Sequence, residues 1–172
     1  MWVSSEPIIV SLRPNNLGRV LFSADVLGAS KKQQNDVEFK LDSGSDFTII
    51  SRRDLIRSLG YSKEFLNSCP LYYTENPRVN ATQVDGTPLP LRYIKNISMM
   101  VNGREIINTR IFFQSEEQKG KETRNLFGTD ILKYFNWSID YDKWLLTLSK
   151  RNLANVELSP GEKRLEVYDL TS

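Results

Sequence analysis

Asp42, Ser43 and Gly44 form a short polar stretch between two apolar runs, residues 37–41 and 47–50. Alone, such a tripeptide is ordinary turn chemistry, because Asp and Ser side chains bond their own backbone and Gly adopts positive φ. The flanking runs, however, predict two strands that both enter a core, with the turn inside or at the floor of a cleft. A carboxylate in such a place is costly unless it is paired or hydrogen-bonded. Asp42 is therefore the first candidate for acid–base chemistry.

The chain contains no histidine, and Cys69 is its single cysteine. Ser-His and Cys-His nucleophile pairs and histidine-ligated metal sites are therefore excluded. Any hydrolytic chemistry must use carboxylates, lysine, tyrosine or hydroxyl groups, and we expect neither a metal nor a cofactor. A single cysteine forms no intrachain disulfide, which favours a cytoplasmic location.

The charges of the chain are nearly balanced, with 23 basic and 21 acidic residues and a net charge of +2. This balance argues against nucleic acid or a membrane surface as a partner. The opening residues, MWVSSEPIIV, lack a basic stretch followed by a long apolar core, so we expect no signal peptide. No apolar run approaches the roughly 20 residues of a membrane span.

Short strands and turns dominate the predicted secondary structure before residue 60. Residues 18–28 and 37–41 predict a hairpin joined by the polar connection 29–36, and residues 47–50 predict a strand leaving the Asp42 turn. A short helix is expected over residues 51–59, because Ser51 is a suitable N-cap and Gly60 a suitable stop. Residues 61–77 are expected to be irregular.

Three further hairpins are predicted from two-residue turn signals between apolar runs. Their turns are Asp85-Gly86, Asn102-Gly103 and Asp142-Lys143. Hairpins at this spacing indicate an all-β barrel or sandwich with one or two short helices. The pattern of strands divides the 172 residues into an N-terminal extension (1–16), one domain (17–149) and a polar C-terminal tail (150–172).

Two segments, in this order, resemble the retropepsin-like aspartic proteases. FKLDSGSDFTII (39–50) is similar to their active-site loop, and NLFGTDILKYFNWSIDYDKWLLTL (125–148) is similar to their closing segment. The Gly-x-Asp form of the second segment is nearest to Gypsy-type retrotransposon proteases and to the protease domain of DNA-damage-inducible ubiquitin-shuttle proteins. The resemblance spans residues 18–148. It implies a closed retropepsin-like β-barrel with a flap hairpin, assembled as a homodimer.

The resemblance also implies an activity, that of an aspartic endopeptidase cleaving a peptide or polyprotein substrate. Asp42 would face its counterpart from a second chain, and two like charges roughly 3 Å apart would share one proton. One carboxylate would take a proton from water while the other donates one toward the peptide carbonyl. The chain has one such motif, which predicts a homodimer with the active site on the two-fold axis. Release from a polyprotein would also fit this family.

The resemblance assigns roles to further residues around Asp42. Ser43 and Gly44 would support the active-site loop, and Ser45 and Asp46 would bind substrate. The flap would be the hairpin around Asp85-Gly86, although its turn chemistry alone also fits an ordinary surface hairpin. The expected flap contacts to substrate are Val84, Asp85, Gly86 and Thr87.

Two other functions stay open from the sequence. A protease-like fold can lose activity and survive as a catalytically weak or inactive dimerisation or peptide-binding module, although Asp42, Ser43 and Gly44 are intact. A β-barrel binding module unrelated to proteases would leave the segment around Gly128 unexplained. Asp130 is interpreted as a helix N-terminal residue, where an acidic group suits the helix dipole, and not as a second catalytic carboxylate.

Overall fold

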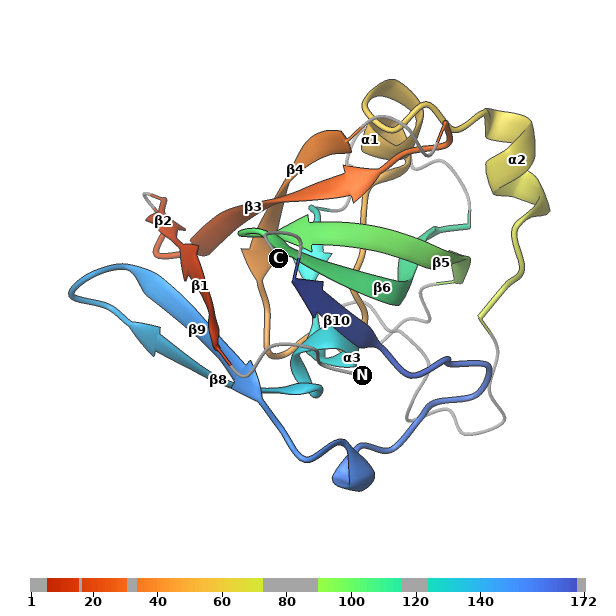
Figure 1. Cartoon of the computed structure of the whole chain (residues 1–172). Coiled ribbons are helices and arrows are strands. Elements are labelled where there is room, and N and C mark those ends of the chain that lie inside the picture. Colours follow the sequence, from red (N-terminus) through yellow and green to blue (C-terminus); the bar gives the residue numbers. More distant parts are fainter. Residues whose placement is uncertain (1–5, 16, 31–33, 73–89, 116–123, 170–172) are drawn as a thin grey trace.

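The computed structural model describes residues 6–15, 17–30, 34–72, 90–115 and 124–169, and the chain forms two β-sheets with three short α-helices (Figure 1). The larger sheet has the strand order β10-β6-β5-β3-β4-β7, with β2 on the side of β3. Its strands are β2 (Arg13–Pro14), β3 (Val20–Leu27), β4 (Gln34–Leu41), β5 (Leu91–Val101), β6 (Arg104–Gln114), β7 (Leu126–Phe127) and β10 (Glu166–Asp169). The smaller sheet has the order β1-β9-β8, from β1 (Ile8–Ser11), β9 (Leu145–Lys150) and β8 (Phe135–Asp140).

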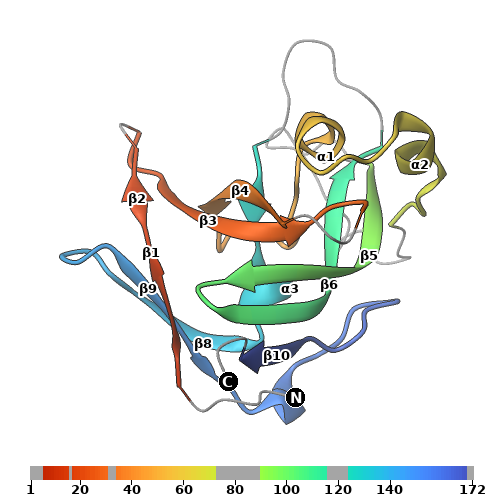
Figure 2. The same cartoon turned by 45° about the horizontal axis from the view of Figure 1, so that its top comes forward.

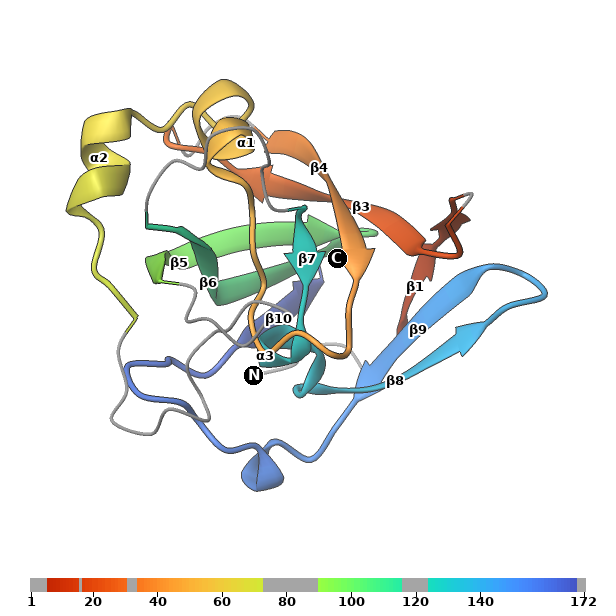
Figure 3. The same ribbon diagram turned by 180° about the vertical axis from the view of Figure 1, so that it is seen from behind.

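The larger sheet curls until its two ends approach each other. Ile49 forms a parallel bridge with Phe112 of β6 and an antiparallel bridge with Leu126 of β7. Figure 3 shows the segment after β4 returning beside β7 in this way. The all-β, barrel-like class predicted from the sequence is therefore confirmed.

The hairpins follow the turn signals in the sequence. β3 pairs with β4, β5 with β6 and β8 with β9, all antiparallel. At the β5–β6 turn, Asn102 and Gly103 have φ of 44° and 78°, as a two-residue turn with positive φ at both positions requires. These three predicted hairpins are confirmed.

The helices are α1 (Arg52–Arg57), α2 (Lys63–Ser68) and α3 (Thr129–Leu132). α1 was predicted, and the Ser51 side chain caps it by accepting from Asp54 N at 3.1 Å. α2 was not predicted, because its six residues carry little periodicity; Ser62 caps it by accepting from Phe65 N at 3.1 Å. Figure 2 shows α1 and α2 at one end of the molecule, opposite the β8–β9 hairpin. No helix in the described part of the chain is long and apolar enough to cross a membrane.

Two expectations about elements were wrong. Residues 47–50 form no regular strand, and only Ile49 makes isolated bridges. The polar pattern after residue 149 gave no sign of β10, which pairs antiparallel with β6 and buries Val167. At the other end, β1 pairs with β9 and buries Ile8 and Val10. Both chain ends therefore contribute strands to the fold.

An aromatic cluster lies beneath the end of β4, where the Asp42 turn begins. Phe22 and Phe39 each contact Phe127, with ring centroids 5.0 and 5.7 Å apart in edge-to-face geometry. All three rings are at most 1% exposed. Burying rings of this size makes the junction of β3, β4 and β7 a rigid part of the core, which fixes the direction in which the chain leaves β4.

Candidate active site

The polar stretch after β4 is a tight turn closed by its own hydrogen bonds. Ser45 N donates to Asp42 O at 3.1 Å, and Gly44 N donates to the Asp42 side chain at Oδ1 at 3.0 Å. The Ser45 hydroxyl donates to Phe47 O at 2.8 Å. The Asp42 carboxylate is thus aimed by the backbone of its own turn, as Asp and Gly in this order favour.

The turn leaves its functional groups accessible. The Asp42 side chain is 25% exposed, and Lys40 Nζ lies 3.6 Å from Asp42 Oδ2. Ser43, Gly44 and Asp46 are exposed. A second molecule can therefore reach the carboxylate and the residues that surround it.

The segment that begins with β7 holds this turn from the other side. Asp42 N donates to Phe127 O at 3.0 Å, immediately after the parallel pairing of Leu41 with Phe127. Thr129 donates twice to Ser45 O, from its N at 2.8 Å and from its Oγ1 at 3.2 Å. The Asp42 turn and the segment after β7 lie about 85 residues apart in the sequence. Their backbone groups are hydrogen-bonded to each other, so the two segments form one unit.

Gly128 allows the two segments to approach this closely. A Cβ on Gly128 would lie 2.4 Å from Phe47 O and 2.7 Å from Ser45 O. Both neighbours are backbone atoms, so no side-chain rotation would relieve the contact. Glycine is required here by the close approach of two backbones.

Asp130 completes the link between the segments. Its Oδ1 accepts from Thr48 Oγ1 at 2.6 Å, and its Oδ2 accepts from Thr48 N at 3.0 Å. Thr48 Oγ1 in turn accepts from Gly128 N at 3.1 Å. Burial raises the pKa of Asp130 to about 6, although the hydrogen bonds from Thr48 oppose the rise. Asp130 lies in the first turn of α3, as predicted, and it also bonds Ile131 N.

The predicted flap contacts Val84, Asp85, Gly86 and Thr87 lie outside the described residues. The chain on either side of them is paired, because Leu71 bridges Arg92 in antiparallel fashion and Tyr72 N donates to Leu91 O at 2.8 Å.

An aromatic group connects this pairing to the Asp42 turn. Tyr72 contacts Phe47 and Phe112, with ring centroids 5.2 and 5.3 Å away. Phe47 and Phe112 also contact each other at 4.8 Å. Tyr72, the last described residue before residues 73–89, therefore packs against Phe47, which lies five residues after Asp42.

Sequence reasoning missed two residues of this arrangement. The sequence pattern predicts only a strand position for Thr48, yet its buried side chain bonds both Gly128 and Asp130. The sequence pattern indicates no role for Asn125, yet its side chain accepts from Ser51 N at 2.8 Å and donates to Asp54 Oδ2 at 2.7 Å. A hydroxyl inside an apolar run is the one signal that could have indicated Thr48, because a buried hydroxyl needs a partner.

Comparison with known proteins gives a match in structure but not in sequence. No protein-family model matches the chain, and no curated protein matches it. Among solved structures, it is similar to a retropepsin-like aspartic protease from Rickettsia conorii, with a TM-score of 0.50 and 20% sequence identity. The match covers 84% of this chain and 89% of that one. The chain therefore has a retropepsin-like fold.

Proposed function

We propose that the protein is an aspartic endopeptidase that acts as a homodimer. The observation that carries this proposal is the Asp42 turn, which follows β4, leaves its carboxylate partly exposed and is held by hydrogen bonds from the segment around Gly128. The retropepsin-like fold supports the same function. A rigidly held, solvent-accessible carboxylate in a histidine-free chain fits acid–base catalysis on a water molecule.

In the proposed mechanism, the Asp42 carboxylates of two chains share one proton. The ionised carboxylate removes a proton from the attacking water, and the protonated one donates to the carbonyl oxygen of the scissile peptide bond. The tetrahedral intermediate then collapses as the amine leaves with a proton. No covalent bond to the enzyme forms.

The neighbouring residues take supporting roles in this proposal. Ser43 and Gly44 stabilise the pair of turns around the two-fold axis, and Ser45 and Asp46 bind the peptide backbone. The Ser45 hydroxyl donates to Phe47 O, its N donates to Asp42 O and its O accepts from Thr129, so Ser45 would contact the peptide by packing against it. Val84, Asp85, Gly86 and Thr87 would cover the peptide from the opposite side.

The test is cleavage of a mixed peptide library by wild-type protein and by Asp42→Asn, analysed by mass spectrometry. Asp42→Asn keeps the shape of the side chain and removes its ionisation, so cleavage should fall by at least about a thousandfold. Asp36→Asn is the matched control, because Asp36 is an exposed carboxylate on β4, the strand that precedes Asp42. It should cleave like wild type.

Two outcomes would contradict the proposal. Cleavage that survives in pure Asp42→Asn would show that another group performs the chemistry. A folded, dimeric wild-type protein that cleaves no peptide in the library would instead favour a protease-like binding module without activity.

A further inference from the structure

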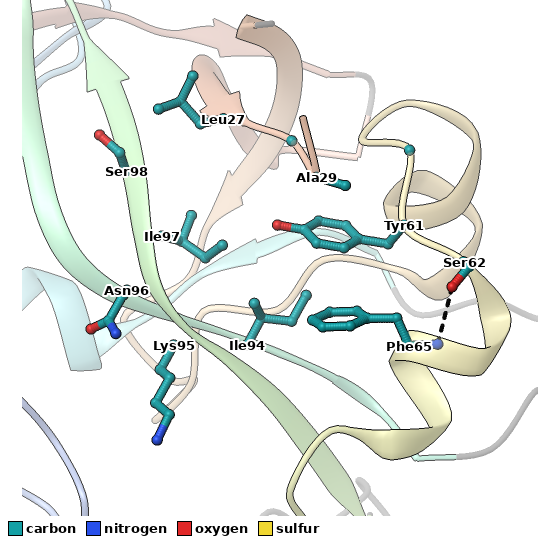
Figure 4. A pocket seen from close by; sticks show the side chains of 12 residues that line it. Leu27, Ala29, Tyr61, Ser62, Phe65, Ile94, Lys95, Asn96, Ile97 and Ser98 are labelled. Atoms are coloured by element: carbon teal, nitrogen blue, oxygen red, sulfur yellow. Dashed lines mark hydrogen bonds between the residues drawn. The ribbon is translucent and has the colours of Figure 1, made fainter. Parts of the chain in front are cut away.

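A cavity of about 670 Å³ lies between β5 and the segment that joins α1 to α2 (Figure 4). No residue of the Asp42 turn lines it. This volume lies within the roughly 300–1,000 Å³ of small-molecule sites. Its apolar lining consists of Leu27, Ala29, Tyr61, Phe65, Ile94 and Ile97.

A β-bulge in β5 directs two isoleucines into this cavity. Residues three apart in a regular strand point to opposite faces. The pairing of β5 with β6 shifts register between Ile94 and Ile97, and Asn96 between them has φ of 60°. Both isoleucines consequently line the same cavity, and each is 7% exposed. Bulges of this kind often re-aim a side chain at a functional site.

The opposite wall is fixed in place by backbone contacts. Ala29 N donates to Leu59 O at 2.9 Å, and a Cβ on Gly28 would lie 2.4 Å from that oxygen. Tyr61 and Phe65 are stacked, with ring centroids 5.3 Å apart and planes 18° apart. This wall therefore cannot move inward easily to close the cavity.

The polar groups of the cavity favour an acidic ligand. The Tyr61 ring reaches across the cavity toward Ile97 (Figure 4). A tyrosine hydroxyl is protonated at neutral pH, and burial raises the pKa of Tyr61 further above its ordinary value. The Ser98 hydroxyl is already engaged, because it donates to Glu105 at 2.6 Å. Among the described residues that line the cavity, Lys95 at its edge is the one charged group, and none is a carboxylate.

Further positive charge lies next to Lys95. Lys95 and Asn96 also line a smaller cavity of about 240 Å³, together with Arg110 and Lys163. Arg110 is paired with Glu162 at 3.5 Å, and Lys163 interacts electrostatically with Glu166, so Lys95 is the charge that faces both cavities within the described part of the chain. A recess lined by one sign of charge attracts a ligand group of the opposite sign.

We propose that the larger cavity binds a small amphipathic carboxylate. The apolar body of the ligand lies between the Tyr61–Phe65 stack and the isoleucines of the bulge. Its carboxylate lies at the mouth of the cavity, where the exposed Lys95 side chain, which extends away from the Tyr61–Phe65 stack in Figure 4, turns toward it and donates a charge-assisted hydrogen bond. This site is separate from the Asp42 turn and does not depend on the proposed peptidase activity.

The experiment is a calorimetric and NMR titration of the wild-type protein with octanoate and with octan-1-ol, its uncharged counterpart. Octanoate should bind in a 1:1 ratio and shift the amide signals of the β5 bulge and of Tyr61. Octanol should bind about fivefold more weakly, as expected when an exposed ion pair is lost.

Two variants separate the charge from the cavity. Lys95→Gln should weaken octanoate about fivefold and leave octanol unchanged, whereas Lys143→Gln, in the β8–β9 turn, should change neither. Ala29→Trp, at an exposed rim position, should weaken both ligands by occupying the cavity. Three outcomes would overturn the proposal. The first is absence of octanoate binding at about 5 mM, a concentration that detects even millimolar affinity. The others are equal affinity for octanoate and octanol, and octanoate affinity that is unchanged in both Lys95→Gln and Ala29→Trp.

Discussion

Gly128 is the residue whose size matters most to the candidate active site. A methyl group there would meet two backbone oxygens well inside contact distance. Gly128→Ala should therefore displace the Asp42 turn and lower the free energy of unfolding by about 2–3 kcal/mol, the usual cost of overpacking. Chemical denaturation measures the change in stability, and peptide cleavage measures the displacement of the turn.

Gly18→Ala provides the control for this substitution. Gly18 has φ of +76°, and no atom lies within 4 Å of the position that a Cβ would take, so alanine there is strained but meets no neighbour. It should cost about 1 kcal/mol through its backbone conformation and leave cleavage unchanged. A Gly128→Ala protein with wild-type stability and activity would show that the two segments have room to separate.

Asp130 makes the stability of the contact between the Asp42 turn and the Gly128 segment depend on pH. Its pKa is about 6 in the folded protein and near 3.8 without the fold, so the folded state holds this proton more tightly. The stability that the group contributes is thus fully present below pH 3.8 and is lost as the pH rises through 6. The loss between these limits is on the order of 3 kcal/mol.

The comparison with Asp130→Asn isolates this contribution, because asparagine does not titrate. The difference in unfolding free energy, wild type minus Asp130→Asn, should shrink steadily between about pH 4 and pH 7. Urea denaturation at closely spaced pH values measures it, with Asp36→Asn as an exposed-carboxylate control. A difference that stays constant or grows with pH would show that Asp130 is not held as a weak acid.

At the scale of elements, the C-terminal segment is attached to the barrel through Glu162. This carboxylate accepts from Lys133 Nζ at 2.8 Å and lies 3.5 Å from Arg110 Nη2. Arg110 and Glu162 side chains are each 6% exposed. Burial raises the pKa of Glu162, but hydrogen bonds from Lys133, Tyr134 and Ser159 outweigh it and keep the pKa below its ordinary value. Glu162 is therefore ionised at neutral pH and joins Arg110 of β6 to Lys133, the residue that follows α3.

Glu162→Gln should destabilise the protein strongly, because it removes the ion-pair partner of the buried Arg110. Breaking a buried pair in this way costs about 3–5 kcal/mol. Glu157→Gln, an exposed position in the same segment, should stay within about 0.5 kcal/mol of wild type. Thermal unfolding and hydrogen exchange of the β10 amides measure both effects. Equal stability of the two variants would mean that the segment is held by its apolar contacts alone.

The sequence predicted the hairpins because their turn residues are local signals. It did not predict β10, since this strand forms by pairing with the distant β6. The segment before β10 is likewise held by Arg110 and Lys133, which lie 49 and 29 residues away from Ser159 and Glu162 along the chain. The same division holds in the candidate site. Asp42 and Gly128 belong to motifs that can be read directly, whereas the Thr48–Asp130 pair spans 82 residues and required the tertiary structure.

At the scale of the whole molecule, one chain presents one Asp42 turn. Ser43, Gly44 and Asp46 are exposed around it. Both terminal strands pair within their own chain, β1 with β9 and β10 with β6. A second chain would therefore complete the proposed site by meeting this face, while the barrel of each chain stays intact.

Mixing experiments test whether the two carboxylates act together. If each active site needs Asp42 from both chains, a mixed dimer of wild type and Asp42→Asn is inactive. After full exchange in an equimolar mixture, the wild-type dimer is about a quarter of all dimers, so cleavage should fall to about a quarter of that of the same total amount of wild type. An equimolar mixture with Asp36→Asn should keep full activity.

Sedimentation at the assay concentration must show dimers, and specific activity should decline on dilution as the dimers dissociate. Activity of one half in the Asp42→Asn mixture, or constant specific activity in a monomer, would mean that a single chain carries a complete site.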